Sequence, residues 1–180
     1  NRFFSFIYFF YDNAGKLLSI TNRAGLSHSL SYFTAGVNIG LIQKVTDSFG
    51  RTLTFEYNSL GRISAITDPA GGRYLYGYNN NTVNLTQVTY PDNKTRVYHY
   101  ESGVNVNLLT GITDENGQRF ATYAYDGNQR ATLSEHAGGA GRVTVSVVSS
   151  VTQNVTTHVS GTLTAPRTYD FQAVQGVLRN

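Results

Sequence analysis

Hydrophobic and polar positions alternate along this chain in short runs separated by turns. Residues 52–57 read Thr-Leu-Thr-Phe-Glu-Tyr, so we expect Leu53, Phe55 and Tyr57 on one face of a strand and the polar residues on the other. No window of about ten residues keeps apolar positions at the spacing of an amphipathic helix. The pattern predicts an all-β fold of roughly 12 to 16 short strands, arranged as antiparallel hairpins.

The turns between these runs share one chemistry. An Asp or Asn opens the turn and a Gly closes it three residues later, as in Asp68-Pro69-Ala70-Gly71. Asp and Asn bond their own backbone two residues on, Pro fixes φ, and Gly tolerates positive φ. We therefore expect positive φ at Gly61 and Gly71, where a β-branched residue is predicted to break the turn.

Tyrosines at the ends of the runs recur at a nearly constant spacing. Six of them lie 21 to 25 residues apart: Tyr11, Tyr32, Tyr57, Tyr78, Tyr100 and Tyr125. In each interval one turn follows the tyrosine directly and a second turn lies about half an interval later. A fixed period of this size indicates a repeat architecture in which each repeat is stabilised by its neighbours.

Two of the longer intervals share a local sequence. Gly36-Val37-Asn38-Ile39 and Gly103-Val104-Asn105-Val106 each lie shortly before a pair of aliphatic residues. We interpret both as lengthened loops on one rim of the sheet. In another interval Tyr90-Pro91-Asp92-Asn93 replaces the second turn, with Pro91 at the position where a turn favours its fixed φ.

The pattern weakens towards the end of the chain. A glycine-rich segment, 137–141, precedes alternating Val and Thr or Ser at 143–147, and a Tyr-Asp pair returns at Tyr169-Asp170. We interpret residues 1–136 as clear repeats and 137–180 as a degenerate continuation of the same array. The chain begins and ends within the pattern, so we expect it to be a fragment of a longer protein.

Composition narrows the functional classes. With 40% hydrophobic and 14% charged residues, the chain is not disordered by composition. The net charge is +3, but the basic residues lie singly after turns, which does not favour a nucleic-acid surface. The absence of Cys excludes a disulfide framework and a thiolate metal site. No run of 18 apolar residues is present, so no membrane-spanning helix is predicted.

An aromatic run occupies residues 3–10, Phe-Phe-Ser-Phe-Ile-Tyr-Phe-Phe. It is too short for a membrane helix and lacks the cationic lead and cleavage site of a signal peptide. Two interpretations remain, a strand buried on both faces and wrongly assigned residues at the end of a fragment.

Candidate chemistry is sparse. The sequence contains four histidines, His28, His99, His136 and His158, and they do not lie at metal-ligand spacing. No nucleophile-elbow motif is present. The aspartates are explained by turn chemistry. We therefore predict no catalytic residue, no cofactor and no metal site in this segment.

The repeated phrase resembles a known family. It reads Tyr-Asp-x-x-Gly-Arg, an aliphatic residue, and then Ile-Thr-Asp-x-x-Gly, which is similar to the YD repeat of Rhs proteins. Residues 57–71 match nearly throughout, with Asn58 in place of Asp. Residues 11–25 match with Lys16 for Arg and Asn22 for Asp.

A third copy, residues 113–127, matches up to Asp126, after which the Gly comes early. The resemblance covers about residues 8–136 clearly and 137–180 weakly. Asp68-Pro69-Ala70-Gly71 also resembles the phrase near the self-cleavage site of the family, but we favour an ordinary repeat turn.

The resemblance implies a curved, spiralling β-sheet shell, a cocoon. In bacterial Rhs polymorphic toxins and insecticidal toxin complexes such a shell encloses a toxic C-terminal domain, and in the related teneurins it serves adhesion. The chain would then be a structural section that encapsulates and shields a secreted bacterial effector, as in interbacterial competition. It departs from the family in having about six to eight repeats, fewer than a closed shell needs, and no self-cleavage segment.

The resemblance also implies the partners and the important positions. The partners are the remainder of the shell and an enclosed toxin domain, with secretion-system components and surface glycans as further candidates. Any self-cleavage or toxin activity would lie outside this segment. The structural turn and anchor residues are Tyr11, Asp12, Gly15, Tyr57, Gly61, Arg62, Asp68, Gly71, Asp114, Gly117, Tyr125 and Asp126.

An alternative function rests on the tyrosines. Tyr74, Tyr76 and Tyr78 fall on one face of a predicted strand, and Tyr98 and Tyr100 on another. Such rings are expected to pack across strands within the sheet. The alternative is a carbohydrate-binding or adhesion module, since aromatic rings stack on sugars.

Overall fold

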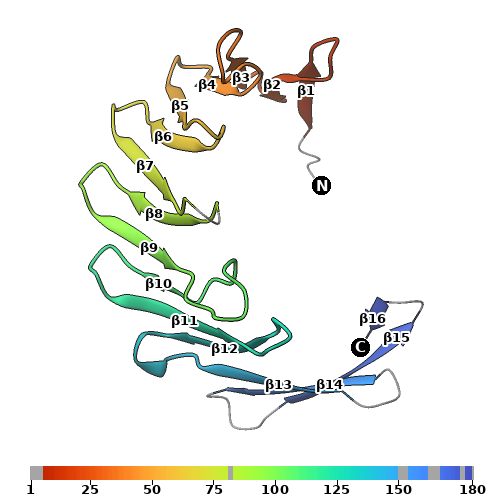
Figure 1. The fold of residues 1–180 in the computed structure, drawn as a ribbon. Coiled ribbons are helices and arrows are strands. Elements are labelled where there is room, and N and C mark those ends of the chain that lie inside the picture. Colours follow the sequence, from red (N-terminus) through yellow and green to blue (C-terminus); the bar gives the residue numbers. More distant parts are fainter. Residues whose placement is uncertain (1–5, 81–82, 150–153, 162–166, 175–176, 180) are drawn as a thin grey trace. The chain divides into compact units, whose positions relative to one another are not determined.

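The computed structural model is built almost entirely from β-strands (Figure 1). It describes residues 6–80, 83–149, 154–161, 167–174 and 177–179. Sixteen strands follow chain order in the sheet without a crossover. Within the described ranges the helical element is a single 3-10 turn, η1 (Ala137–Gly139). The all-β prediction is confirmed, and the number of strands is at the upper end of the expected range.

The chain divides into two units. The first holds Asn1–Gly77 and Val88–Asn93, and the second holds Tyr78–Gln87 and Lys94–Asn180. The first unit contains β1 (Ile7–Tyr11), β2 (Leu17–Asn22), β3 (Ser27–Tyr32), β4 (Ile42–Asp47), β5 (Thr52–Tyr57), β6 (Ile63–Thr67) and nearly all of β7 (Arg73–Tyr78). β8 (Leu85–Thr89) has residues in both units. The second unit contains β9 (Thr95–His99), β10 (Gly111–Thr113), β11 (Arg119–Tyr125), β12 (Ala131–His136), β13 (Val143–Ser149), β14 (Asn154–Gly161), β15 (Arg167–Val174) and β16 (Val177–Arg179).

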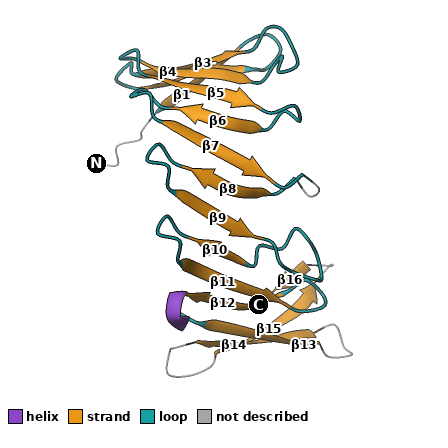
Figure 2. Cartoon of the chain, turned by 60° about the vertical axis from the view of Figure 1, so that its left-hand side comes forward, coloured by secondary structure: helices purple, strands orange, loops and turns teal. Residues whose placement is uncertain are grey.

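Consecutive strands within each unit form antiparallel hairpins, and the strand arrows alternate in direction (Figure 2). The register shifts at the tyrosine end of several ladders, between Phe10 and Tyr11, between Glu56 and Tyr57, and between Ala124 and Tyr125. Such a β-bulge adds one residue to a strand and strengthens its twist. The tyrosine positions are therefore the places where each hairpin is bent.

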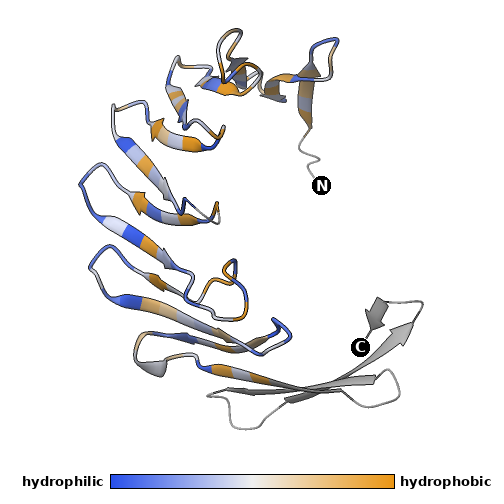
Figure 3. Cartoon of the chain, viewed as in Figure 1, coloured by the Kyte–Doolittle hydropathy of each residue, from blue (hydrophilic) through white to orange (hydrophobic). Residues whose placement is uncertain are grey.

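Burial is low throughout the described side chains. Among residues 6–80 and 83–145, the buried residues are Gly111 and three hydrophobic residues, Ala65 at 1%, Ala121 at 1% and Val88 at 8% exposure. Most other strand residues are half-buried, and hydrophobic and hydrophilic bands alternate along the strands of each unit (Figure 3). This half-burial is expected where side chains cover their neighbours along a single sheet and no second layer packs on the sheet. Stability then depends on contacts between neighbouring hairpins.

The first strand contradicts one interpretation of the aromatic run. In its described part, β1 is exposed at every position, from 52% at Ile7 to 58% at Tyr11. A strand buried on both faces is therefore wrong for Ile7–Tyr11. The reason is that β1 pairs with β2, while the described residues place no second layer over either of its faces.

The alternation predicted for residues 52–57 is incomplete. Phe55 and Tyr57 are half-buried, whereas Leu53 is 38% exposed and the threonines of the opposite face are half-buried. In a sheet without a packed second layer, neither face is uniformly covered. Leu53 instead lines a shallow surface hollow with Val45 and Pro69.

The two lengthened loops are present where the sequence predicted them. Residues 33–41 connect β3 to β4, and residues 100–110 connect β9 to β10. The turn at Tyr90 also forms, because the N–H of Asn93 donates to the carbonyl of Tyr90 at 2.9 Å, with Asn93 at a φ of 64°. Over the residues that the structure describes, none of the helical structure is long and apolar enough to cross a bilayer.

Candidate functional site

Seven turns of the described chain share one hydrogen-bond pattern. The opening residue donates its N–H to the carbonyl four residues on, and its own carbonyl accepts from the N–H three residues on. In one such turn Asp68 N–H donates to Gly72 at 2.9 Å, and Gly71 N–H donates to Asp68 at 3.0 Å. The seven opening residues are Asp12, Asn22, Asp47, Asn58, Asp68, Asp114 and Asp126.

The side chain of each opening residue completes the turn. Its Oδ1 accepts from the N–H groups two and four residues on, at 2.8–3.0 Å in all seven turns. One short side chain thereby satisfies two backbone donors that the hairpin leaves without a ladder partner. Asn supplies the same oxygen as Asp, which explains why Asn22 and Asn58 replace the aspartate.

The residue that closes the turn lies in the left-handed region. Six of the seven closing residues are glycines with φ between 71° and 87°, among them Gly61 at 71° and Gly71 at 87°. In the seventh turn Gln129 takes this position with a φ of 65°. The early glycine of the third repeat, Gly127, therefore does not replace the closing glycine, and a side chain stands where the other turns have none.

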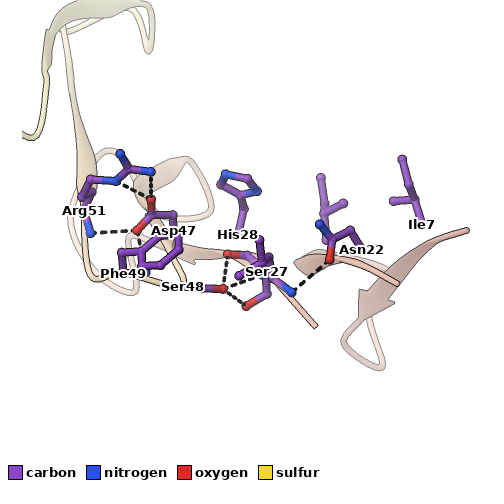
Figure 4. A pocket seen from close by; sticks show the side chains of 10 residues that line it. Ile7, Asn22, Ser27, His28, Asp47, Ser48, Phe49 and Arg51 are labelled. Carbon is purple, nitrogen blue, oxygen red and sulfur yellow. Dashed lines mark hydrogen bonds and ion pairs between the residues drawn. The ribbon is translucent and has the colours of Figure 1, made fainter. Parts of the chain in front are cut away.

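Two turns carry an additional ion pair between the opening aspartate and the arginine four residues on. Asp47 Oδ2 lies 2.6 Å from Arg51 Nε and Nη2, as drawn in Figure 4, and Asp126 Oδ2 lies 2.7 Å from Arg130 Nε. At Asp47 desolvation acts to raise the pKa, but the Arg51 side chain and the N–H groups of Arg51 and Phe49 together lower it. At Asp126 the N–H of Arg130 is the largest cause of a lowered pKa, with desolvation opposing it and the guanidinium adding to it.

Three of the periodic tyrosines bond back to the neighbouring strand of their own hairpin. The hydroxyl of Tyr57 donates to the carbonyl of Ile42 at 2.7 Å, and that of Tyr125 donates to Leu109 at 2.9 Å. Tyr32 makes the same bond to Leu17 at 2.6 Å. The acceptors lie 15 or 16 residues upstream, at or next to the start of the strand that directly precedes the tyrosine's own strand in the sheet. Each tyrosine thus adds a side-chain bond to two strands that already share a ladder.

Packing reinforces this connection at Tyr57. Its ring meets Phe33 edge to face, with centroids 6.1 Å apart. Burial raises the pKa of the Tyr57 hydroxyl, which keeps it protonated and able to donate. The hydroxyl bond links β5 to the start of β4, and the ring contact links it to the loop that precedes β4.

The remaining predicted anchors fall into the same pattern. Asp12, Asp68 and Asp114 each open a turn, and Gly15 and Gly117 close theirs at φ values of 80° and 75°. Arg62 follows the Asn58 turn and donates its N–H to Asn58 Oδ1 at 3.0 Å. Tyr11 is 58% exposed. The structure therefore distributes the predicted residues along the ends of the strands and does not gather them into one site.

A surface hollow of about 360 Å³ lies in the first unit, between β1, β2, β3 and the turn that follows β4 (Figure 4). Ser48 ties this turn to β3, because its Oγ accepts from Ser27 N–H at 2.6 Å. Phe49 remains 71% exposed beside it. The hollow is lined by Ile7, Ile20, Asn22, Leu26, Ser27, His28, Asp47, Ser48, Phe49 and Arg51.

The histidines and carboxylates form no metal-binding group in the described ranges. No group of three or more His, Cys, Asp or Glu side chains there is placed to hold a metal ion. His99 Nε2 pairs with Thr113 Oγ1 at 2.7 Å, and His136 packs on Phe120 with ring centroids 5.2 Å apart. Both contacts are those of residues that pack within a sheet.

The tyrosine faces are partly occupied by the protein itself. Tyr74, Tyr76 and Tyr78 are half-buried, and Tyr74 meets Tyr90 edge to face at 6.0 Å. Burial, followed by the nearby Tyr98, raises the pKa of the Tyr100 hydroxyl. These observations favour packing within the sheet.

Sequence reasoning did not find the acceptors of the tyrosine hydroxyls or the role of Gln129. The nearly constant number of residues from one tyrosine to the next indicated that the tyrosines are anchor positions. The carbonyls that receive the bonds have no sequence signal, because every residue carries one. The position of Gln129 was detectable as the only mismatch in an otherwise regular turn phrase among residues 113–130.

The family comparison agrees with the repeated turn phrase. The family model described as RHS Repeat matches residues 39–74 and 57–95. Residues 39–95 of this chain carry Rhs repeats. The two matched segments overlap and include the Asn58 and Asp68 turns and the Tyr57 anchor.

Solved structures of toxin complexes share the fold of this Rhs-repeat chain. The crystal structure of TcdB2-TccC3 without its hypervariable C-terminal region matches with a TM-score of 0.60 and 14% identity, covering 97% of this chain and 10% of that one. TcdB2-TccC3-Cdc42 matches with a TM-score of 0.59 and 14% identity, over 93% and 10%. The Tc holotoxin pore of Photorhabdus luminescens gives 0.56 and 16%, over 92% and 9%. The chain spans about a tenth of the chains that it matches, and at this identity the likeness shows the fold.

Proposed function

We propose that this chain is a structural section of an Rhs-type β-shell that encapsulates and shields a toxic C-terminal effector domain for delivery to target cells. One observation carries the proposal. Sixteen strands in sequential order have three buried hydrophobic residues among the side chains described, so the hairpins form a wall and not a globular core. Tyrosine hydroxyls and turn carboxyls hold this wall together.

The comparisons support the toxin part of the proposal. The protein similar over 97% of this chain is solved both as a complex and without its hypervariable C-terminal region. By analogy, the partners of the Rhs-repeat chain are the remainder of its shell and a C-terminal effector. Export from a bacterium, with secretion-system components or surface glycans as contacts, follows from the same analogy.

We also propose that the segment catalyses no reaction. Its turn-opening Asp and Asn side chains serve as backbone acceptors, and this structural role accounts for their presence in the sequence. Any self-cleavage or toxin activity would then lie elsewhere in the full-length protein.

Protease protection tests the encapsulation directly. The full-length protein that contains this chain is digested under native conditions, and C-terminal fragments are identified by mass spectrometry. We expect the C-terminal domain to survive intact until the shell is denatured. A C-terminal domain digested as fast as an isolated copy of that domain would refute encapsulation, whatever the fold of the repeats.

Carbohydrate binding is the alternative function. Tyr74 and Tyr90 already contact one another, which leaves less ring surface for a sugar. The alternative stays a prediction, and a glycan array with the full-length protein tests it. Specific glycan binding that is lost on Tyr76→Ala but not on Tyr125→Phe would favour it over the shell.

A further inference from the structure

The long loop 100–110 contacts a turn on each side of it in the second unit. Asn84 Nδ2 donates to the carbonyl of Val106 at 2.9 Å, which links the loop to the chain just before β8. Asn105 Nδ2 donates to Gln129 Oε1 at 2.7 Å, which links it to the turn between β11 and β12. The loop is therefore bonded to both of its neighbours at the same end of the strands.

The loop is ordered by its own hydrogen bonds. Ser102 Oγ accepts from Val104 N–H at 3.2 Å, and Asn105 Oδ1 accepts from Asn107 N–H at 2.9 Å. The carbonyl of Asn105 also accepts from Leu108 N–H at 3.1 Å. Asn105 thus organises the loop with its oxygens and binds the next turn with its amide nitrogen.

The other long loop, 33–41 in the first unit, has the same arrangement with different chemistry. Lys16 Nζ, from the turn before it, donates to the carbonyl of Gly40 at 3.3 Å and lies 4.3 Å from the centre of the Tyr32 ring. On the other side, Leu41 lies beside Gly61 of the following turn, within 3.8 Å of where a Cβ on Gly61 would stand. Two loops that share the sequence Gly-Val-Asn-Ile/Val therefore both bridge a preceding and a following turn.

The backbone conformation of Gln129 indicates that its bond with Asn105 has a structural role. It is the residue that stands in the left-handed region where the other six turns have glycine. A non-glycine residue at positive φ is disfavoured. The side chain that glycine would lack is the one that accepts the bond from Asn105.

We propose that the two long loops are straps, each of which clamps the turns before and after it, and that Gln129 is the latch residue of the strap at residues 100–110. Without the straps, neighbouring strands are joined at this end by their ladder bonds and, within single hairpins, by the tyrosine bonds. With them, opening of one turn requires release of the next. The straps thus make the rim of the sheet open as a unit. This inference concerns the sheet itself and does not depend on an enclosed effector.

A pair of isosteric substitutions tests the latch in the full-length protein. Asn105→Asp keeps the oxygen that receives Asn107 N–H, and the Gln129 amide turns over to donate to it. Gln129→Glu keeps an acceptor for Asn105. In the double variant two carboxylates face each other and the bond is lost. The rate of amide hydrogen exchange, measured by mass spectrometry, is expected to stay near that of the wild type in both single variants. In the double variant it is expected to rise about tenfold.

The strap predicts where the change appears. Exchange is expected to rise together in peptides covering 100–110 and 126–130. Asn107→Asp, a charge added to an exposed position of the same loop, is the matched control and is expected to change neither. Asn84→Asp removes the donor that bonds the carbonyl of Val106 on the other side of the loop. It is expected to accelerate hydrogen exchange in residues 100–110, and this test remains if the double variant does not fold.

Two outcomes would overturn the proposal. One is a double variant that exchanges like the single ones. The other is acceleration confined to 100–110 with 126–130 unchanged, which would make the loop an independent surface feature. Because the readout is exchange in the repeats, either result leaves the encapsulation of an effector to be decided separately by protease protection.

Discussion

At the scale of single residues, the closing glycine of the turn isolates the contribution of backbone conformation. Gly71 has a φ of 87°, and a Cβ placed on it would meet no atom within 4 Å. Gly71→Val is therefore expected to destabilise the full-length protein through backbone strain alone, by about 1–3 kcal/mol. Denaturant or thermal unfolding followed against wild type measures this. Wild-type stability would show that positive φ is not required there.

Gly127 is the matched control for that substitution. It lies in the equivalent type of turn with its φ outside the left-handed region, and a Cβ on it would also meet no atom within 4 Å. Gly127→Ala is expected to be neutral or to stabilise by about 0.4–1 kcal/mol, because Ala restricts the unfolded chain. Equal destabilisation by both substitutions would point to a general intolerance of side chains in these turns.

The turn carboxyls give a prediction for pH. The pKa values of Asp47 and Asp126 are lowered from the ordinary 3.8, so their turns gain stability above that value and lose it as the pH falls through the lowered values. The Arg51 side chain is the largest lowering cause at Asp47, whereas at Asp126 the Arg130 N–H is larger than the guanidinium. Removing each guanidinium is therefore expected to change the pKa of Asp47 and the pKa of Asp126 by different amounts.

Arg51→Met should raise the pKa of Asp47 more than Arg130→Met raises that of Asp126. NMR titration of ¹³C-labelled aspartate carboxyls measures both values. Equal rises, or none at Asp47, would mean that the backbone N–H groups dominate in both turns.

At the scale of the element, the tyrosine hydroxyl adds a side-chain bond to two strands that share a ladder. Tyr125→Phe removes the bond to Leu109 while keeping the ring, and is expected to cost about 0.5–1.5 kcal/mol. Tyr123→Phe, on the same strand, is the control, because the Tyr123 hydroxyl makes no hydrogen bond within the described residues. Unfolding midpoints of the full-length variants measure the difference. Equal midpoints for the two variants would remove the hydroxyl bond as a source of stability.

Much of the element pattern followed from local sequence because turn chemistry is local. The opening Asp or Asn bonds atoms two and four residues away, so the phrase that specifies the turn also contains its partners. The tyrosine acceptors lie 15 or 16 residues upstream and depend on the register in which neighbouring strands pair. The exposure of β1 and Leu53 depends on what covers the sheet, which short-range alternation does not encode.

At the scale of the whole molecule, the scarcity of buried residues predicts the behaviour of these 180 residues in isolation. Ala65, Val88 and Ala121 are the buried hydrophobic residues among the side chains described, while β1 exposes Phe9 at 53% along with its neighbours. A sheet edge presents unpaired N–H and C=O groups to any other strand. We therefore expect the isolated chain to self-associate, as measured by light scattering and size-exclusion chromatography.

The route of that association is testable by placing a charge on the edge strand. Phe9→Lys puts a cation on β1 and is expected to reduce association, because a charge on an edge strand opposes pairing with another chain. Leu18→Lys makes a similar change at a 41% exposed position of β2, which pairs with a strand on both sides. If Phe9→Lys acts more strongly, association proceeds through the edge. Equal effects would assign it to exposed apolar surface in general, and a monomeric chain with a sharp melting transition would show that these hairpins are stable without further neighbours.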